Sequence, residues 1–244
     1  MLTNPTIETV DQYWSSFLGC DREVLYKTQI LVIPHADLTD YDGLFLFVRD
    51  ELFLVSVPQN LLDSFHTQAA GWSRADALEE GWLRSHISLP IELVVGPAFV
   101  GYTDDGAFRP ANHEDTRFLA PQDMTALADL KEACSALEWK HGGSQLGEQP
   151  VVGAFNRQCL VAAAGYKVWG GVIAHISVIT HPQYRGQGYG KAVVSRVTAD
   201  ALSRGLVPQY QTLEANMPSM AIGQALGFER YATTVAVRLK STSI

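Results

Sequence analysis

The stretch HISVITHPQYRGQGYGKA, residues 175–192, is the most informative part of this sequence. It begins with an apolar, β-branched run that is typical of a strand, and it continues into a loop with three glycines at alternate positions. Beyond the loop, apolar residues recur at helical spacing as far as Arg204, and Gly205 is a natural helix end. A loop of this kind directs backbone N–H groups and the positive end of a helix dipole at one point. We therefore expect it to bind phosphate.

The spacing of these glycines argues against two common phosphate-binding loops. A Walker A loop requires G-x-x-x-x-G-K followed by Ser or Thr, whereas Gly190-Lys191 is followed by Ala192 and has Arg185 where the first glycine belongs. A dinucleotide fingerprint requires a terminal G-x-x-G and an early place in a βαβ unit. From these residues alone, a glycine-rich turn without a ligand remains the alternative.

Around the loop, the second half of the chain alternates strands and helices. The expected strands are Thr116–Leu119, Val151–Phe155, Cys159–Tyr166, Val172–Thr180, Tyr210–Glu214 and Tyr231–Leu239. The expected helices cover Pro121–Trp139, the stretch from Gly190 to Arg204, and Pro218–Leu226. This order predicts an α/β or α+β fold with a mixed sheet.

The first half also mixes strands and helices, but it has no glycine-rich loop. The expected elements are helices at Ile7–Leu18, Leu61–Ala70 and Arg74–His86 and strands at Gln29–Pro34, Leu44–Val48, Leu52–Val57, Ile91–Val95 and Ala98–Tyr102. Each half contains a hairpin around a short polar turn. Because the hairpins are alike, the first half, a smaller α/β domain, could be a degenerate copy of the second half, and this is left open.

A boundary between two domains is indicated by the polar, turn-rich stretch Gly101–Asp115. We place it so that the domains are 1–112 and 113–244. Residues 1–110 hold 16 acidic and 6 basic side chains, whereas residues 111–244 hold 10 acidic and 12 basic ones. An acidic chain without a basic stripe argues against nucleic acid as a partner, while the second half is compatible with a small anion.

The composition is that of a globular protein, with 244 residues of which 47% are hydrophobic and 18% charged. Its apolar runs are far shorter than the roughly 18 residues of a membrane-spanning helix, so we expect no membrane partner. No basic residue precedes Arg22, which argues against a secretory signal peptide. Cys20, Cys134 and Cys159 form no C-x-x-C pair, so we expect reduced thiols in a cytoplasmic protein and no metal site.

Two motifs together resemble those of the GNAT N-acetyltransferase superfamily. One is the coenzyme A pyrophosphate loop, with Arg or Gln, two residues, Gly, one residue, then Gly or Ala. The other is an Asn at the end of the next strand, followed by a helix and Gly-Phe. The residues that carry the resemblance are Arg185, Gly188 and Gly190 in the loop and Asn216, Gly227 and Phe228 downstream. The order of elements from Thr116 to Leu239 also agrees with that fold.

The resemblance implies an acetyl-CoA-dependent acyltransferase with a mixed-sheet GNAT fold in its second half. The backbone of Val178–Thr180 would pair with the pantetheine arm, residues 186–191 would surround the pyrophosphate, and Asn216 would contact the arm near the thioester. The cofactor-binding residues implied are Val178, Ile179, Thr180, Arg185, Gly186, Gln187, Gly188, Tyr189, Gly190, Lys191 and Asn216.

The catalytic residues depart from the common family pattern. Many relatives have a tyrosine four residues before the Gly-Phe, as general acid, where this chain has Gly223. The usual positions of the glutamate base correspond to His175 and Gln211, of which only the histidine titrates near neutral pH. Glu214 is a second candidate base. Candidates for the missing acid are Tyr189, Tyr210 and Tyr231.

Direct attack of a neutral amine on the thioester in a ternary complex needs little more than proximity and a polarised carbonyl, so the missing tyrosine is compatible with activity. The resemblance places the acceptor, an amine of a small molecule or peptide, near Glu138–Gly143. The first domain would shape the acceptor cleft, as in two-part glycine N-acyltransferase-like enzymes. The alternative function is a non-catalytic CoA-binding or interaction module.

The acceptor and the assembly state are the least determined points. An acidic first domain favours a cationic amine, whereas the glycine N-acyltransferase-like arrangement points to an acidic one. A homodimer is left open.

Overall fold

The computed structural model describes residues 1–38, 41–111, 115–145 and 150–240. Their contacts define two compact units, each discontinuous in sequence. Unit 1 consists of Met1–Thr6, Gly101–Gln211 and Met217–Glu229, and unit 2 consists of Ile7–Val100, Thr212–Asn216 and the chain from Arg230 onward. The predicted boundary between residues 112 and 113 lies outside the described residues, and the division into 1–112 and 113–244 stays a prediction.

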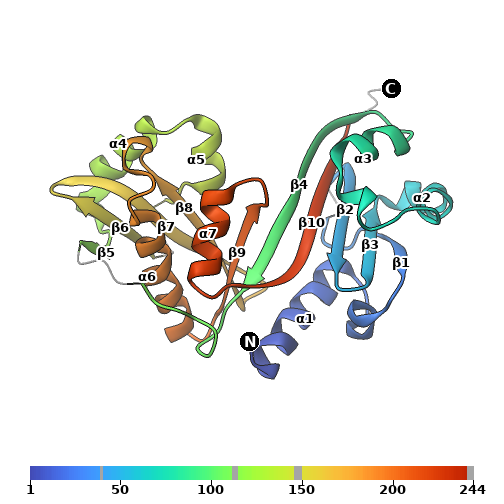
Figure 1. Cartoon of the computed structure of the whole chain (residues 1–244), viewed down its shortest axis with the longest axis horizontal. Helices are drawn as coiled ribbons and strands as arrows, with labels where there is room; N and C mark the ends of the chain where they lie inside the picture. The colour runs from blue at the N-terminus through green and yellow to red at the C-terminus, as the bar shows by residue number, and fades with distance from the viewer. Residues whose placement is uncertain (39–40, 112–114, 146–149, 241–244) are drawn as a thin grey trace. The chain divides into compact units, whose positions relative to one another are not determined.

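Unit 1 is built on a mixed sheet with the strand order β9-β8-β7-β6-β5 (Figure 1). Its strands are β5 (Thr116–Phe118), β6 (Val151–Asn156), β7 (Cys159–Trp169), β8 (Ile173–Thr180) and β9 (Val207–Leu213). The strands from β5 to β8 pair antiparallel, whereas β8 and β9 are parallel and are joined through a helix.

The helices of unit 1 are α4 (Met124–Ala133), α5 (Ala136–Gly142), α6 (Tyr189–Ser203) and α7 (Met217–Ala225), with short 3-10 turns at Pro121–Asp123 and Pro182–Tyr184. Helix α6 packs on β6, β7 and β8 through the apolar face expected from the sequence. Its buried residues include Ala192, Val193, Val194, Val197 and Ala201. Helix α4 buries Leu127 and Leu130 in a second cluster that includes Ile179 of β8.

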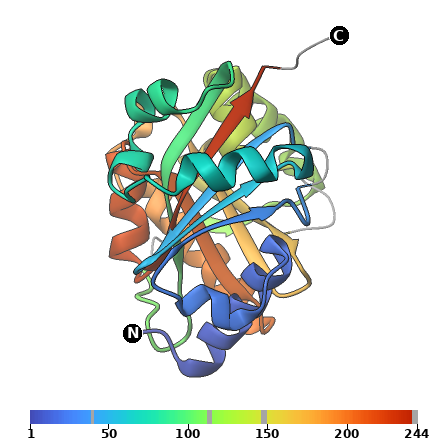
Figure 2. The same cartoon turned by 90° about the vertical axis from the view of Figure 1, so that its right-hand side faces the viewer.

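Unit 2 has the strand order β1-β3-β2-β10-β4. Its elements are β1 (Ile30–Pro34), β2 (Gly43–Arg49), β3 (Leu52–Val57), β4 (Ile91–Tyr102), β10 (Glu229–Leu239), α1 (Asn4–Leu18), α2 (Leu62–Ala69) and α3 (Glu80–His86), with 3-10 turns at Arg22–Tyr26, Gln59–Leu61 and Asp76–Leu78. Because strand side chains alternate, one face of β2 presents Phe45 and Phe47 to Trp14 of α1. The other face joins the cluster of α2 and α3. Figure 2 shows α2, in teal, lying across the blue strands of unit 2.

The fold class predicted from the sequence, α/β with a mixed sheet, is confirmed by this architecture. The two strand pieces expected at Ile91–Val95 and Ala98–Tyr102 form one strand that continues through Gly96. Strand β9 begins at Val207 rather than at Tyr210. None of the helices within the described ranges is both long and apolar enough to cross a membrane.

A buried ion pair stands in the core of unit 2. The guanidinium of Arg49 donates to Asp11 Oδ1 at 2.6 Å and to the Tyr231 hydroxyl at 2.7 Å. Asp11 also accepts from the hydroxyls of Tyr231 and Tyr26. The Arg49 guanidinium lies over both tyrosine rings, with its central carbon 4.2 Å from the centroid of Tyr231 and 4.6 Å from that of Tyr26. The side chains of Arg49 and Asp11 are only 9% and 1% exposed.

Replacing Asp11 with alanine should destabilise unit 2 by about 3–5 kcal/mol, because it leaves the Arg49 charge buried without a counterion. Urea unfolding followed by circular dichroism measures this loss. The matched control is Asp21→Ala, which removes an exposed carboxylate and should change the free energy of unfolding by no more than about 0.5 kcal/mol. Equal effects of the two substitutions would contradict a structural role for the Arg49–Asp11 pair.

Candidate functional site

Strand β8 pairs with its parallel neighbour β9 over only the first half of its length. It pairs with β7 along its whole length, from Ile173 to Thr180, but its register with β9 runs only from Ile173 opposite Val207 to Ile176 opposite Tyr210. The predicted pantetheine-binding residues 178–180 therefore lie beyond the register with β9. A strand edge of this kind offers main-chain hydrogen bonds to an extended, amide-bearing ligand.

The loop after β8 has the backbone geometry expected of an anion-binding turn. Gly186 and Gly188 have positive φ angles of +75° and +90°, and, apart from the adjoining residues of the chain, no described protein atom lies within 4 Å of a Cβ placed on either. Gly188 caps the N-terminus of α6, whose first turn contains no acidic residue. The side of the loop on which these Cβ positions lie is therefore open at the N-terminus of α6, which fits an approaching phosphate.

Gly190 has a different role from the other two loop glycines. It is buried within α6, and a Cβ at this position would lie 2.9 Å from the Thr180 hydroxyl and 3.3 Å from Ile222 Cδ1. Only a residue without a side chain lets the first turn of α6 approach β8 so closely. The third glycine of the motif thus sets the packing of helix against strand.

The loop residues that were predicted to bind the cofactor have side chains with several different partners. Arg185 donates from Nε to the Thr180 carbonyl at 3.2 Å and forms an ion pair with Glu138 at 2.6 Å. Gln187 donates to the Gln183 carbonyl at 3.3 Å. The buried Tyr189 accepts from the Asn156 amide at 2.8 Å. Lys191 is exposed on α6.

His175 occupies a defined position on β8, opposite Gln209 of β9. Its Nδ1 is 2.7 Å from the Gln209 side-chain oxygen, and its ring stacks on Trp169 with centroids 3.7 Å apart. The Gln209 amide nitrogen in turn donates to the buried Tyr102 hydroxyl. We assign the proton to Nδ1, since the Gln209 oxygen can only accept.

The environment of His175 suits a proton acceptor. Burial lowers the pKa of its imidazole below the usual 6.5, and the hydrogen bond to Gln209 partly offsets this shift. The ring is therefore neutral at pH 7, with its lone pair on Nε2. Among the residues that the structure describes, Nε2 has no hydrogen-bond partner.

The other candidate base and Asn216 belong to unit 2. The carboxylate of Glu214 pairs with the Arg230 guanidinium and accepts from the Thr233 hydroxyl at 3.4 Å. The Asn216 N–H donates to the Leu213 carbonyl at 2.9 Å. The Glu214 carboxylate is thus engaged by protein groups, whereas Nε2 of His175 has no hydrogen-bond partner among the described residues. The roles predicted for Glu214 and Asn216 stay predictions.

The three tyrosines considered as general acid have different surroundings. Tyr210 is buried beside Phe228, its hydroxyl is 2.8 Å from that of Ser219, and burial raises its pKa to about 12. Tyr189 is bonded to Asn156, as described above. Tyr231 belongs to the ion-pair network of unit 2. None of these contacts selects one tyrosine as the acid.

The predicted acceptor segment, Glu138–Gly143, covers most of α5 and lies against β8. A Cβ on Gly142 would be 2.3 Å from the Val178 carbonyl oxygen, so the end of α5 contacts the β8 backbone directly. The hydroxyls of Ser144 and Ser177 follow at 3.0 Å. Trp139 packs on the cluster that contains Ile179. The structure thus brings this segment to the same strand as His175 and the loop.

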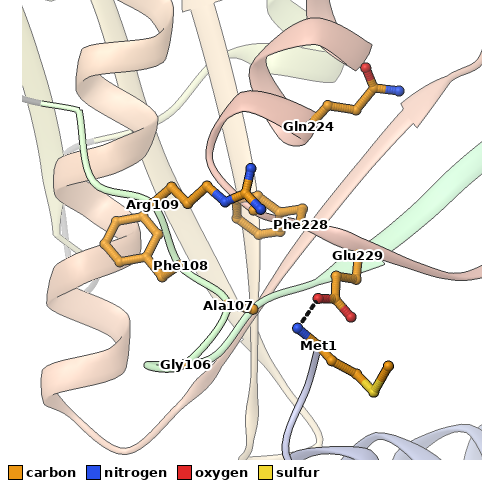
Figure 3. A pocket seen from close by; sticks show the side chains of 9 residues that line it. Met1, Gly106, Ala107, Phe108, Arg109, Gln224, Phe228 and Glu229 are labelled. Atoms are coloured by element: carbon orange, nitrogen blue, oxygen red, sulfur yellow. Dashed lines mark ion pairs between the residues drawn. The ribbon is translucent and has the colours of Figure 1, made fainter.

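A separate hollow of about 280 Å³ lies elsewhere in unit 1 (Figure 3). It is lined by Met1, Gly106, Ala107, Phe108, Arg109, Gln224, Gly227, Phe228 and Glu229. The Met1 amine pairs with Glu229 at 2.6 Å on one side of it. No sequence pattern indicated this hollow. In the described parts of the chain, no cluster of three or more His, Cys, Asp and Glu side chains could hold a metal ion.

Sequence reasoning missed Gln209 and Tyr102, which fix the orientation of His175. The only signal was the predicted strand–helix–strand order from Val172 to Glu214, a unit whose two strands usually lie parallel in one sheet. The register itself, with His175 opposite Gln209, could be read only from the structure.

Comparison with known families agrees with this geometry. The family model described as GNAT acetyltransferase matches residues 152–236, from β6 to β10. This segment is therefore similar to GNAT acetyltransferases. The matched segment contains β8, the glycine loop, α6 and the Asn216 motif, which are the features that suggested the resemblance. No curated protein matches the chain.

Solved structures extend the likeness beyond the matched segment. An acetyltransferase of the GNAT family from Colwellia psychrerythraea is 14% identical, with 98% of both chains covered and a TM-score of 0.52. At this identity the match shows the fold. A GCN5-related N-acetyltransferase from Kribbella flavida is 17% identical over 67% of this chain and 64% of its own length, with a TM-score of 0.49. The chain therefore spans less than two thirds of that protein.

Proposed function

We propose that this protein is an acetyl-CoA-dependent N-acyltransferase that transfers an acetyl group to an amine of a small molecule or peptide. The observation that carries the proposal is the loop between β8 and α6. Its two glycines with positive φ open onto free space at a helix N-terminus, within a segment similar to GNAT acetyltransferases. Such a loop admits a pyrophosphate to the backbone N–H groups.

The residues of the loop fit coenzyme A. The backbone of residues 186–191 would bind the pyrophosphate, with Lys191 adding a positive charge, and residues 178–180 would pair with the pantetheine arm. Bound acetyl-CoA supplies an activated thioester with a good leaving group. A preformed loop needs little rearrangement on binding, which favours affinity.

His175 is the proposed proton acceptor of the reaction. The amine nitrogen attacks the thioester carbonyl, the C–N bond forms, the C–S bond breaks, and the amine proton goes to Nε2 of His175. The thiolate leaves as coenzyme A and can take its proton from water. Positioning of the amine and polarisation of the carbonyl supply the rest of the acceleration.

The proposal predicts thiol release from acetyl-CoA in the presence of a suitable amine. A panel of cationic, neutral and anionic amines, assayed at low and high ionic strength, should give at least one acceptor with a rate well above background hydrolysis. A cationic acceptor whose rate falls with salt would agree with selection by the acidic first half of the chain. Tight acetyl-CoA binding without turnover on any amine would instead favour a non-catalytic CoA-binding module.

A further inference from the structure

Arg185, the first residue of the loop motif, has its guanidinium directed at protein groups. Its Nη2 is 2.6 Å from Glu138 Oε1, and its Nε donates to the carbonyl of Thr180, the last residue of β8, at 3.2 Å. Thr180 and Arg185 bracket the turn that leads into the glycines. The guanidinium therefore closes this turn and joins it to α5.

Glu138 has both carboxylate oxygens engaged. Oε1 accepts from Arg185, while Oε2 accepts from the Ser135 N–H at 2.9 Å and from the Ser135 hydroxyl at 2.8 Å. This is a capping box at the start of α5. The bonds from Ser135, and then the Arg185 guanidinium, lower the pKa of Glu138, so the carboxylate stays charged at neutral pH.

Helix α5 is consequently attached to the loop after β8 at its start and to β8 itself at its end. At its start Glu138 reaches Arg185, and at its end Gly142 contacts the Val178 carbonyl. The strand residues between these contacts, 178–180, are those proposed to pair with the pantetheine arm. A shift of α5 would therefore move the strand edge and the loop together.

We propose that the Glu138–Arg185 pair is a positioning device that holds the pyrophosphate loop in its binding conformation and couples it to α5. This inference rests on the proposed function. In this proposal the Arg185 guanidinium binds protein groups rather than the phosphates. Glu138 contributes to cofactor affinity although its negative charge repels the cofactor. Both side chains are partly exposed, so the pair should add little to the stability of the fold.

The direction in which Glu138→Gln changes the affinity for acetyl-CoA tests the proposal. Glu138→Gln removes a negative charge close to an anionic ligand, so simple electrostatics predicts tighter binding of acetyl-CoA. Loss of the positioning pair predicts the opposite, about fivefold weaker binding by calorimetry, a size typical of coupled sites. Arg185→Ala should weaken binding by at least a similar factor, and adding Glu138→Gln to it should cause no further loss.

Two controls isolate the pair from other effects. Glu132→Gln neutralises an exposed carboxylate on α4 and should leave affinity unchanged or slightly higher. Ser135→Ala removes the side-chain cap of α5 and one hydrogen bond to Glu138 but keeps the Ser135 N–H bond and the ion pair with Arg185, so it should lower the melting temperature more than the affinity.

The possible results separate this inference from the proposed function. If the wild-type protein does not bind acetyl-CoA, both fail. If it binds and Glu138→Gln binds equally or more tightly, only the positioning role of the pair is wrong. Additive losses in the double variant would also overturn it.

Discussion

A valine at position 188 should reduce the affinity for acetyl-CoA by about 100-fold or more. Gly188 has a φ of +90°, and a Cβ there would project into space that, apart from the adjoining residues of the chain, no described protein atom fills within 4 Å. A branched side chain would occupy the volume through which a pyrophosphate reaches the N-terminal N–H groups of α6. Loss of one or two hydrogen bonds to a charged ligand costs about 3 kcal/mol, which corresponds to that factor. Isothermal titration calorimetry of Gly188→Val against wild type measures it.

The control for Gly188→Val is Gly205→Val, at the other end of the same helix. Gly205 has a φ of +73°, and a Cβ placed on it would also have no described atom within 4 Å apart from the adjoining residues, so valine meets the same backbone strain there. Both variants should lose similar stability in thermal unfolding. Only Gly188→Val should lose affinity. Equal acetyl-CoA affinity in the two variants would contradict a pyrophosphate site at the loop.

The arrangement of helices and strands could be predicted where local patterns were strong. The hairpin of β2 and β3 has two apolar runs around a short polar turn, and α6 has an apolar face bounded by two glycines. Strand β9 was predicted too short because Pro208 is atypical of a strand interior. Which segments belong to which unit could not be predicted, because residues 212–216 and β10 join unit 2 through contacts with residues distant in sequence.

In the candidate site, too, features set by local sequence were predicted, and contacts between residues distant in sequence were not. The loop was predicted from its glycines, since positive φ angles and close packing are local requirements that favour this residue. The partners of its side chains were not predicted. Glu138 lies 47 residues before Arg185, and Gln209 lies 34 residues after His175. Such pairs depend on the register of strands and the placement of α5, which no short pattern encodes.

Removing the imidazole in His175→Ala should lower kcat/KM for the amine by about 100-fold to 10,000-fold at pH 7.5, the range usual for a general base. The imidazole must be neutral to accept a proton, and burial lowers its pKa below 6.5. The contribution of His175 should therefore be complete above pH 6.5 and decline as the pH falls through the lowered pKa. The ratio of wild-type to His175→Ala activity isolates this decline at low pH, because the ionisation of the amine affects both proteins equally.

Gln209→Glu tests the same assignment from the other side of the hydrogen bond. A carboxylate 2.7 Å from Nδ1 would favour the protonated imidazole and raise the pKa of His175. The variant's activity should then begin to fall at a higher pH than that of wild type, while its rate at pH 9 stays close to the wild-type rate. Gln122→Glu is the control, because it introduces the same charge at an exposed position before α4, outside the pair formed with His175. A ratio of wild-type to His175→Ala activity that stays constant with pH, or a Gln209→Glu profile that coincides with wild type, would show that His175 only packs against Trp169.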